Sequence, residues 1–182
     1  GANRFKLAAH GLEDQVAAIN RAAVTLARKV VEASFRPVFI GGSVGPLGVR
    51  LAPFGRVRPE QAFAAFQEQI AALVQAGVDA LFIETQSDLY EVKEAVRAAR
   101  SVSATVPLVA TLTFTRDDRT LLGDSPAKAA AELAGMGADF IGINCSGGPA
   151  QVLRILQTMK RAVPDARFSV MPNAGWPEHI GG

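Results

Sequence analysis

The sequence predicts an α/β fold, a partial (β/α)8 TIM barrel of about five parallel strands that alternate with helices. The first observation is that short runs rich in Val, Ile and Phe alternate with longer amphipathic segments along the chain. The second is that these runs are apolar at successive positions, as in strands buried on both faces of a parallel sheet. The third is that polar residues end several runs, which suits the carboxyl face of a barrel. No run is followed by the GxGxxG of a doubly wound nucleotide-binding fold.

Strict alternation of strand and helix with short connections requires parallel strands and right-handed crossovers. A complete barrel takes about 250 residues, so we expect residues 1–182 to form an incomplete barrel domain that lacks its first strands and its C-terminal segment. The segments expected to form strands are Pro37–Gly42, Asp79–Thr85, Pro107–Phe114, Asp139–Cys145 and Arg167–Asn173.

The helices are expected from apolar periodicity and from residues typical of helix ends. Asp88 and Ser125 each precede a helical segment and suit its N-cap. Proline suits the first turn at Pro59 and ends the last helix at Pro164. The expected helices are 12–30, 59–76, 89–100, 125–137 and 149–162. In the first, the face expected to point to the core consists of Leu12, Val16, Ile19, Ala23, Leu26 and Val30.

The composition excludes several classes of protein. Apolar residues make up 49% of the chain and the formal net charge is only +2, so an ordinary core-forming protein is expected rather than a nucleic-acid-binding one. A single cysteine rules out an internal disulfide, and nothing in the chain requires an oxidising compartment. Neither a signal peptide nor a membrane-length apolar run is found, and we expect a cytoplasmic protein with no membrane partner.

The only cysteine, Cys145, follows Asn144 at the end of an expected strand and precedes "SGGP" and a helix start. A buried thiol is often a small packing residue. At this place, however, the backbone N–H groups of the helix start would stabilise a thiolate. A nucleophilic thiolate needs a base, and a zinc site needs further ligands that this chain cannot supply as cysteines. The residues alone leave these readings open.

A carboxylate and two glycine-containing turns also follow expected strands. Glu84 ends "LFIET", where it would bind a substrate ammonium group, act as a base, or simply be solvated. The turns "GGSVGP" (41–46) and "PNAGWP" (172–177) could present backbone N–H groups to a carboxylate or phosphate, or serve loop geometry alone. Trp176 in the second turn is a candidate lid or a hydrophobic plug, and the polar loop 113–126 is expected to be a solvated turn.

Together, "GANRFKLAAHG", "GGSVGPLG", "LFIET", "GINCSGGP" and "MPNAGWP" resemble the homocysteine S-methyltransferase family over essentially the whole chain. Within it, the chain is similar to the homocysteine-binding modules of cobalamin-dependent methionine synthases and of bifunctional homocysteine methyltransferase/methylenetetrahydrofolate reductases. The resemblance implies a barrel that binds zinc through three cysteines. Cys145 would be one ligand, and the other two would lie in a Cys-Cys segment outside this chain. It also implies that Glu84 contacts the homocysteine amino group and that the pocket is lined by Asn144, Ser43, Val44 and Gly45.

The activity implied by the resemblance is transfer of a methyl group to the zinc-activated homocysteine thiol, which gives methionine. Methylcobalamin is the expected donor, and cobalamin- and methyltetrahydrofolate-binding modules of the same polypeptide are the expected partners. With one of three zinc ligands, this chain alone is expected to be inactive. One alternative is a standalone betaine- or S-methylmethionine-dependent enzyme. Another is a non-catalytic barrel module in which Cys145 is packed. A phosphate-binding isomerase or aldolase is disfavoured, because no expected strand carries a lysine.

Overall fold

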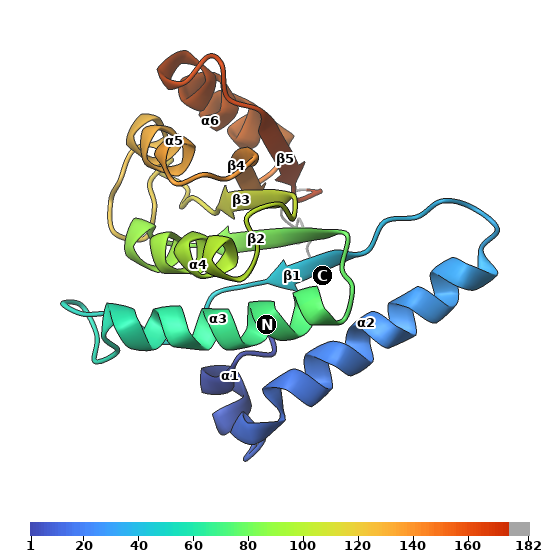
Figure 1. The fold of residues 1–182 in the computed structure, drawn as a ribbon. Coiled ribbons are helices and arrows are strands. Elements are labelled where there is room, and N and C mark those ends of the chain that lie inside the picture. Colours follow the sequence, from blue (N-terminus) through green and yellow to red (C-terminus); the bar gives the residue numbers. More distant parts are fainter. Residues whose placement is uncertain (175–182) are drawn as a thin grey trace, which may run out of the picture.

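The computed structural model describes residues 1–174 and contains one sheet of five parallel strands (Figure 1). The strand order in the sheet equals the order in the sequence, and every neighbouring pair is parallel. A doubly wound sheet reverses its strand order at one point, whereas a barrel adds each strand beside the last. The predicted partial barrel is therefore confirmed. The strands are β1 (Gly41–Val44), β2 (Ala80–Gln86), β3 (Leu108–Leu112), β4 (Phe140–Cys145) and β5 (Phe168–Pro172).

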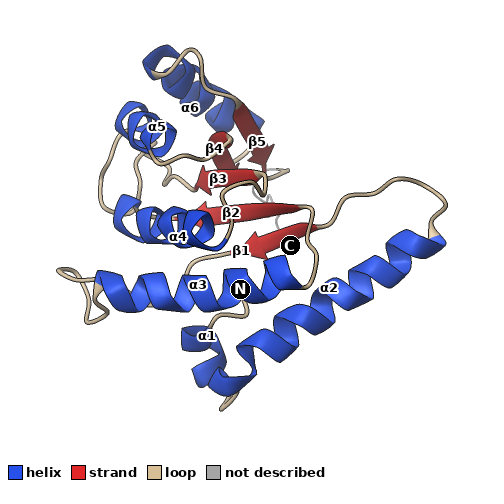
Figure 2. Ribbon diagram, in the orientation of Figure 1, coloured by secondary structure: helices blue, strands red, loops and turns tan. Residues whose placement is uncertain are grey.

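One helix follows each of the first four strands, and these four helices cover one face of the sheet (Figure 2). Two predicted N-caps are confirmed: Asp88 accepts the backbone N–H of Glu91 at 2.8 Å, and Ser125 accepts that of Lys128 at 3.3 Å. A short 3-10 turn, η1 (Glu13–Gln15), separates the first two helices. The helices are α1 (Arg4–Ala8), α2 (Val16–Ala33), α3 (Pro59–Gln75), α4 (Leu89–Val102), α5 (Pro126–Gly135) and α6 (Pro149–Ala162).

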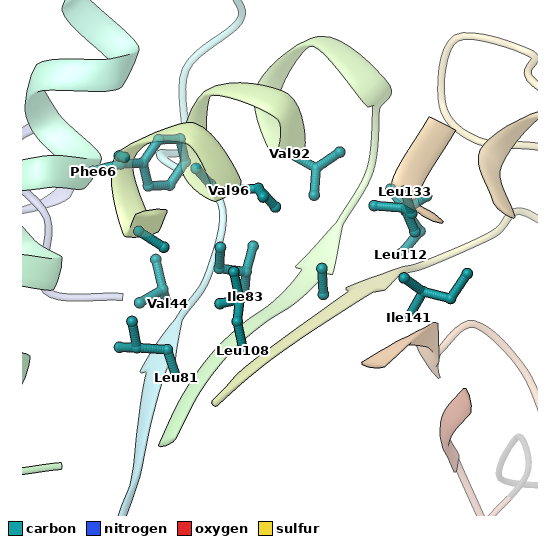
Figure 3. Packing of buried hydrophobic residues seen from close by; sticks show 14 of the residues in the cluster. Val44, Phe66, Leu81, Ile83, Val92, Val96, Leu108, Leu112, Leu133 and Ile141 are labelled. Atoms are coloured by element: carbon teal, nitrogen blue, oxygen red, sulfur yellow. The ribbon is translucent and has the colours of Figure 1, made fainter. Parts of the chain in front are cut away.

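The hydrophobic core lies between the sheet and these covering helices (Figure 3). Ile83 and Leu108 on the sheet and Phe66 on α3 are fully buried there. On the opposite face of the sheet, which is the inside of the barrel, Phe140 is 37% and Met171 50% exposed. This face is exposed because the five strands form an open sheet, but Asn144 at the carboxyl end of β4 is only 4% exposed.

The first strand lies further along the chain than predicted. The apolar run Pro37–Gly42 was expected to form it, but β1 pairs with β2 only from Gly41 onward, and Phe39 is 85% exposed. The carboxylate of Asp79, just before β2, accepts the backbone N–H of Ile40 at 2.6 Å. That side chain ends the ladder, so the apolar residues before it lie outside the sheet.

The buried face of α2 also differs from the prediction. Leu12, Ala23, Leu26 and Val30 were expected to face the core, but all four are exposed, Leu26 at 65% and Val30 at 71%. Val16 is buried as predicted, but the buried row continues through Asn20 and Val24, because α2 packs against α3 and its C-terminal half projects away from the sheet (Figure 1). Because the polar residue Asn20 lies in the buried row, the spacing of apolar residues does not reveal this face. The side-chain amide of Asn20 donates to the carbonyl of Val16 at 2.7 Å.

We expect Gly142→Ala to lower the free energy of unfolding by about 2 kcal/mol, as overpacking of a tight interior does. Gly142 lies in the middle of β4, where a methyl group would overlap the backbone carbonyl oxygen of Ser169 on β5. Backbone cannot move aside without breaking the ladder between the two strands. Denaturant unfolding of the protein that carries this chain measures the change.

Gly135→Ala at the end of α5 is the matched control. A methyl group there meets nothing within 4 Å, and alanine stabilises a helical position by about 0.5–1 kcal/mol relative to glycine. Equal effects of the two substitutions would contradict the close approach of β4 and β5.

Candidate functional site

The carboxyl ends of the first, second and fourth strands bring most of the predicted site residues to the mouth of the barrel. The hydroxyl of Ser43 on β1 donates a hydrogen bond to the carboxylate Oε1 of Glu84 on β2 at 2.5 Å. Ser43 is exposed and Glu84 half-buried, so this pair faces the open inner side of the sheet. Val44 is fully buried toward the helices and Gly45 is buried as well, so among the three residues predicted in this turn only Ser43 is exposed at the mouth.

Three non-glycine residues at the mouth have left-handed backbone conformations. Thr85 has a φ of 58°, Cys145 of 58° and Ser146 of 55°. Such residues cost about 1–3 kcal/mol each and cluster at functional sites. At Thr85 the ladder between β2 and β3 shifts register between Ile83 and Gln86. The strained backbone thus coincides with the two strand ends that carry Glu84 and Cys145.

Cys145 is half-buried at the carboxyl end of β4 and has polar neighbours. Its Sγ lies 3.5 Å from the side-chain Nδ2 of Asn144 and 3.8 Å from the hydroxyl of Thr85. Polar contacts of this kind orient the side chains that bind metals. The surroundings of the thiol therefore fit a metal ligand better than an apolar packing position.

The described residues do not by themselves form a complete metal centre. Within residues 1–174, no group of three or more His, Cys, Asp or Glu side chains is placed to hold a metal ion. His10 is exposed in the turn after α1. A zinc ion bound at Cys145 would therefore take its remaining protein ligands from outside residues 1–174.

Three buried polar residues that the sequence analysis did not identify hold the loop after β1. The backbone N–H of Leu47 donates to the carboxylate Oε1 of Glu91 at 2.5 Å. Gln86 donates to the carbonyl of Val44 at 3.5 Å, and Asn3 to that of Pro46 at 3.4 Å. These contacts fix the turn that follows Ser43. Of the three, only Glu91 could have been suspected from the sequence. It is a carboxylate between two apolar residues, at positions 89 and 92, on the buried side of an amphipathic helix.

Burial raises the pKa of Glu91 to about 7, and the nearby carboxylate of Asp88 adds to the rise. The N–H of Leu47 and the ammonium group of Lys6 act in the opposite direction. The side chain that holds the loop after β1 is therefore partly protonated near neutral pH. This carboxyl group makes the stability of the fold depend on pH.

Because of Glu91, we expect stability to fall by roughly 2 kcal/mol as the pH rises from about 5 to 7. In the unfolded chain this carboxyl ionises near pH 4.5, whereas in the folded chain it ionises near 7. Between those values the folded protein binds a proton that the unfolded chain has lost, so a rising pH favours unfolding. Glu91→Gln keeps an acceptor for Leu47 and should remove this component from the unfolding midpoints. A pH dependence as steep as that of the parent would contradict the assignment, and exposed Glu132→Gln is the control.

The polar loop 113–126 is tied down more firmly than the predicted solvated turn. Arg154 on α6 donates to both carboxylate oxygens of Asp118, at 2.6 and 2.9 Å, and its guanidinium lowers the pKa of that carboxyl. Gln151 donates to the same carboxylate at 3.0 Å. Asp118 therefore fixes the loop to α6 and is not aimed at the mouth of the barrel.

The turn "PNAGWP" is described only as far as residue 174, so Trp176 and His179 lie outside the described residues. Asn173 does reach the site, since its backbone N–H donates to the carbonyl of Gly147 at 3.1 Å. This contact places the end of β5 beside the segment that follows Cys145.

None of the described helices has the length and hydrophobicity needed to cross a bilayer.

Known proteins are similar to the chain in both sequence and fold. The sequence profile described as Homocysteine S-methyltransferase matches residues 1–182. The methionine synthase of Mycobacterium tuberculosis (strain ATCC 25618 / H37Rv) is 31% identical over 186 residues, which cover 97% of this chain and 15% of that protein. The methionine synthase of Mycobacterium leprae (strain TN) is 30% identical over 186 residues, which again cover 97% of this chain and 15% of that protein. The chain thus spans only a small part of these relatives.

Solved structures of the homocysteine methyltransferase MmuM from Escherichia coli have the same fold. Its metallated form matches with a TM-score of 0.80 at 27% identity, over 96% of this chain and 64% of that chain. Its oxidized form matches with a TM-score of 0.78 at 28% identity, over 98% of this chain and 64% of that chain. The described strands and helices therefore correspond to somewhat less than two thirds of that enzyme.

Proposed function

The chain belongs to the homocysteine S-methyltransferase family, and we propose that it forms the homocysteine-binding part of a zinc-dependent enzyme that makes methionine. The observation that carries the proposal is the common location of a thiol and a carboxylate. Cys145 and Glu84 stand at the carboxyl ends of β4 and β2, on the open mouth of the barrel. That face holds the active sites of β/α barrel enzymes.

Each polar group of homocysteine has a counterpart at this mouth. The carboxylate of Glu84 pairs with the substrate ammonium group, and its hydrogen bond from Ser43 at 2.5 Å holds it in place. The substrate carboxylate would bind at the turn after β1, where Ser43 is exposed beside the buried Val44 and Gly45. The thiol of homocysteine then lies toward Cys145.

Cys145 would hold the zinc ion together with two cysteines from outside this chain. A free thiol ionises near pH 8.5, and a coordinated zinc ion deprotonates it at neutral pH, which makes the substrate sulfur a nucleophile. The side-chain amide of Asn144 donates to the Cys145 sulfur at 3.5 Å, and the Thr85 hydroxyl contacts the same sulfur at 3.8 Å. Because this chemistry needs reduced thiols, we place the enzyme in the cytoplasm.

The likeness to methionine synthases favours methylcobalamin as the methyl donor. In that case cobalamin- and methyltetrahydrofolate-binding modules of the same polypeptide would be the partners of this barrel. The likeness to MmuM keeps a standalone homocysteine methyltransferase as the second candidate, with betaine or S-methylmethionine as donor. The barrel mouth would face the donor in each case.

The test uses the full-length protein that carries this chain. We expect one zinc ion per chain and methionine formation from homocysteine with one of three donors supplied separately: methylcobalamin, betaine or S-methylmethionine. Chelation should abolish the activity and added zinc should restore it. A protein that retains no zinc and forms no methionine with any donor would instead support a non-catalytic barrel module.

A further inference from the structure

Asn144 uses its whole side chain inside the protein. It is 4% exposed. Its Oδ1 accepts hydrogen bonds from the backbone N–H of Thr85 at 2.8 Å and from the hydroxyl of Thr111 at 2.7 Å. Its Nδ2 donates to the hydroxyl of Thr85 at 2.7 Å and to the sulfur of Cys145 at 3.5 Å. A side-chain amide has two donors and two acceptor sites, so none remains for a substrate.

These hydrogen bonds join two strands that are not neighbours. Asn144 belongs to β4 and Thr85 to β2, and β3 with Thr111 lies between them. The backbone N–H of Thr85 falls where the ladder between β2 and β3 is interrupted. The side chain of Asn144 thus supplies the hydrogen bond that the ladder does not make, and it holds Thr85 in its left-handed conformation, with a φ of 58°.

The two groups of the proposed site are each one peptide bond away from this link. Glu84 directly precedes Thr85, and Cys145 directly follows Asn144. The link therefore connects the carboxylate that would bind the substrate ammonium group with the thiol that would bind the metal, beside the direct contact of the Thr85 hydroxyl with the Cys145 sulfur at 3.8 Å. A shift of Thr85 relative to Asn144 would change the separation of these two groups.

We propose that Asn144 is a positioning residue that fixes Glu84 relative to Cys145 and thereby sets the length of the amino thiol that the site accepts. The proposal rests on the function proposed above. Homocysteine has one methylene more than cysteine between its α-carbon and its sulfur. If the distance between Glu84 and the metal at Cys145 is fixed, homocysteine can reach both. Cysteine, which is one methylene shorter, can reach only one of them.

Only an amide satisfies all four contacts. Alanine would leave the N–H of Thr85 and the hydroxyl of Thr111 without their acceptor, and such buried donors are costly. Aspartate would keep the acceptor but place an oxygen where Nδ2 now faces the Thr85 hydroxyl and the Cys145 sulfur. The Thr111→Val change removes one donor to Oδ1 at nearly constant volume, and it is the milder variant if Asn144→Ala does not fold.

The experiment compares these variants in the full-length protein by two measurements. The first is the ratio of the dissociation constants of cysteine and homocysteine, obtained by competitive inhibition. The second is the hydrogen-exchange rate of the peptide that contains Thr85, followed by mass spectrometry. We expect Asn144→Ala to lower the preference for homocysteine at least tenfold and to speed exchange at Thr85 at least tenfold. Thr111→Val should shift both in the same direction by about threefold.

Thr25→Val is the matched control, because Thr25 is exposed on α2, where its hydroxyl donates to the carbonyl of Arg21 at 3.0 Å, away from Asn144 and Cys145. It should leave the preference for homocysteine unchanged. Equal loss of affinity for both thiols in Asn144→Ala, or unchanged exchange at Thr85, would overturn the proposal. A parent protein that neither binds nor methylates homocysteine would overturn the proposed function, and the exchange rate would still decide whether Asn144 holds β2 to β4.

Discussion

Replacing Cys145 with serine is expected to remove zinc from the full-length protein and to lower homocysteine methylation at least about a thousandfold. A serine hydroxyl stays protonated at neutral pH and is a poor zinc ligand, so the ion would keep only its ligands from outside this chain. Activation by a metal ion is worth several kcal/mol, and each 1.36 kcal/mol is a factor of ten in rate. Zinc content by atomic absorption and methionine formation are the two measurements.

The control for this prediction is Ser101→Ala, an equally small change at an exposed position of α4. It should retain the zinc and the activity of the parent. If Cys145→Ser also retained both, the thiol would be a packing residue. The site would then lie elsewhere, and the binding-module interpretation would gain support.

The Glu84→Gln substitution is expected to lower kcat/KM for homocysteine about a hundredfold without changing the zinc content. Glutamine keeps an oxygen that accepts from Ser43, so the local geometry should survive while the negative charge is lost. A hydrogen bond to a charged partner contributes about 1.5–3 kcal/mol, and the upper part of that range corresponds to the expected loss. Steady-state kinetics with a zinc determination on the same sample measures it.

A substrate analogue shows whether Glu84 acts on the ammonium group. The compound 4-mercaptobutyrate has the thiol and the carboxylate of homocysteine but lacks the amine. The parent should prefer homocysteine strongly over this analogue, and Glu84→Gln should lose most of that preference, as a double-mutant cycle requires for a direct contact. A variant that still discriminates as the parent does would show that Glu84 does not bind the amine.

The number, type and order of the strands could be predicted because each buried strand is a short apolar run followed by a helix. The register of β1 could not, since it depends on the carboxylate of Asp79 and on where β2 begins. The buried face of α2 was predicted wrongly for a related reason. Its partner is α3, and the polar residue Asn20 lies in the contact. Both errors concern which helix or strand packs against which neighbour. The spacing of apolar residues along one segment does not identify its neighbour.

The candidate site was predictable to the extent that topology brings strand ends together. Glu84 and Cys145 follow apolar runs, so a parallel sheet had to place them on the same edge. The supporting contacts were not predictable. Glu91 holds Leu47 across 44 residues of sequence. The part played by Asn144 depends on an irregularity in β2, and it becomes visible only when three strands are seen together.

The sequential strand order has a consequence for how the protein is made. Because each strand pairs with the one before it in the sequence, no described strand waits for a partner made later than its neighbour, although parallel pairing across a helix is slower than local contact formation. The sheet can therefore grow strand by strand as synthesis proceeds from the N-terminus. The hydrogen bond from Thr85 to Asn144 spans 59 residues, and it can form only after the third and fourth strands have been added. The spacing of the substrate groups is thus set only when β2, β3 and β4 have come together.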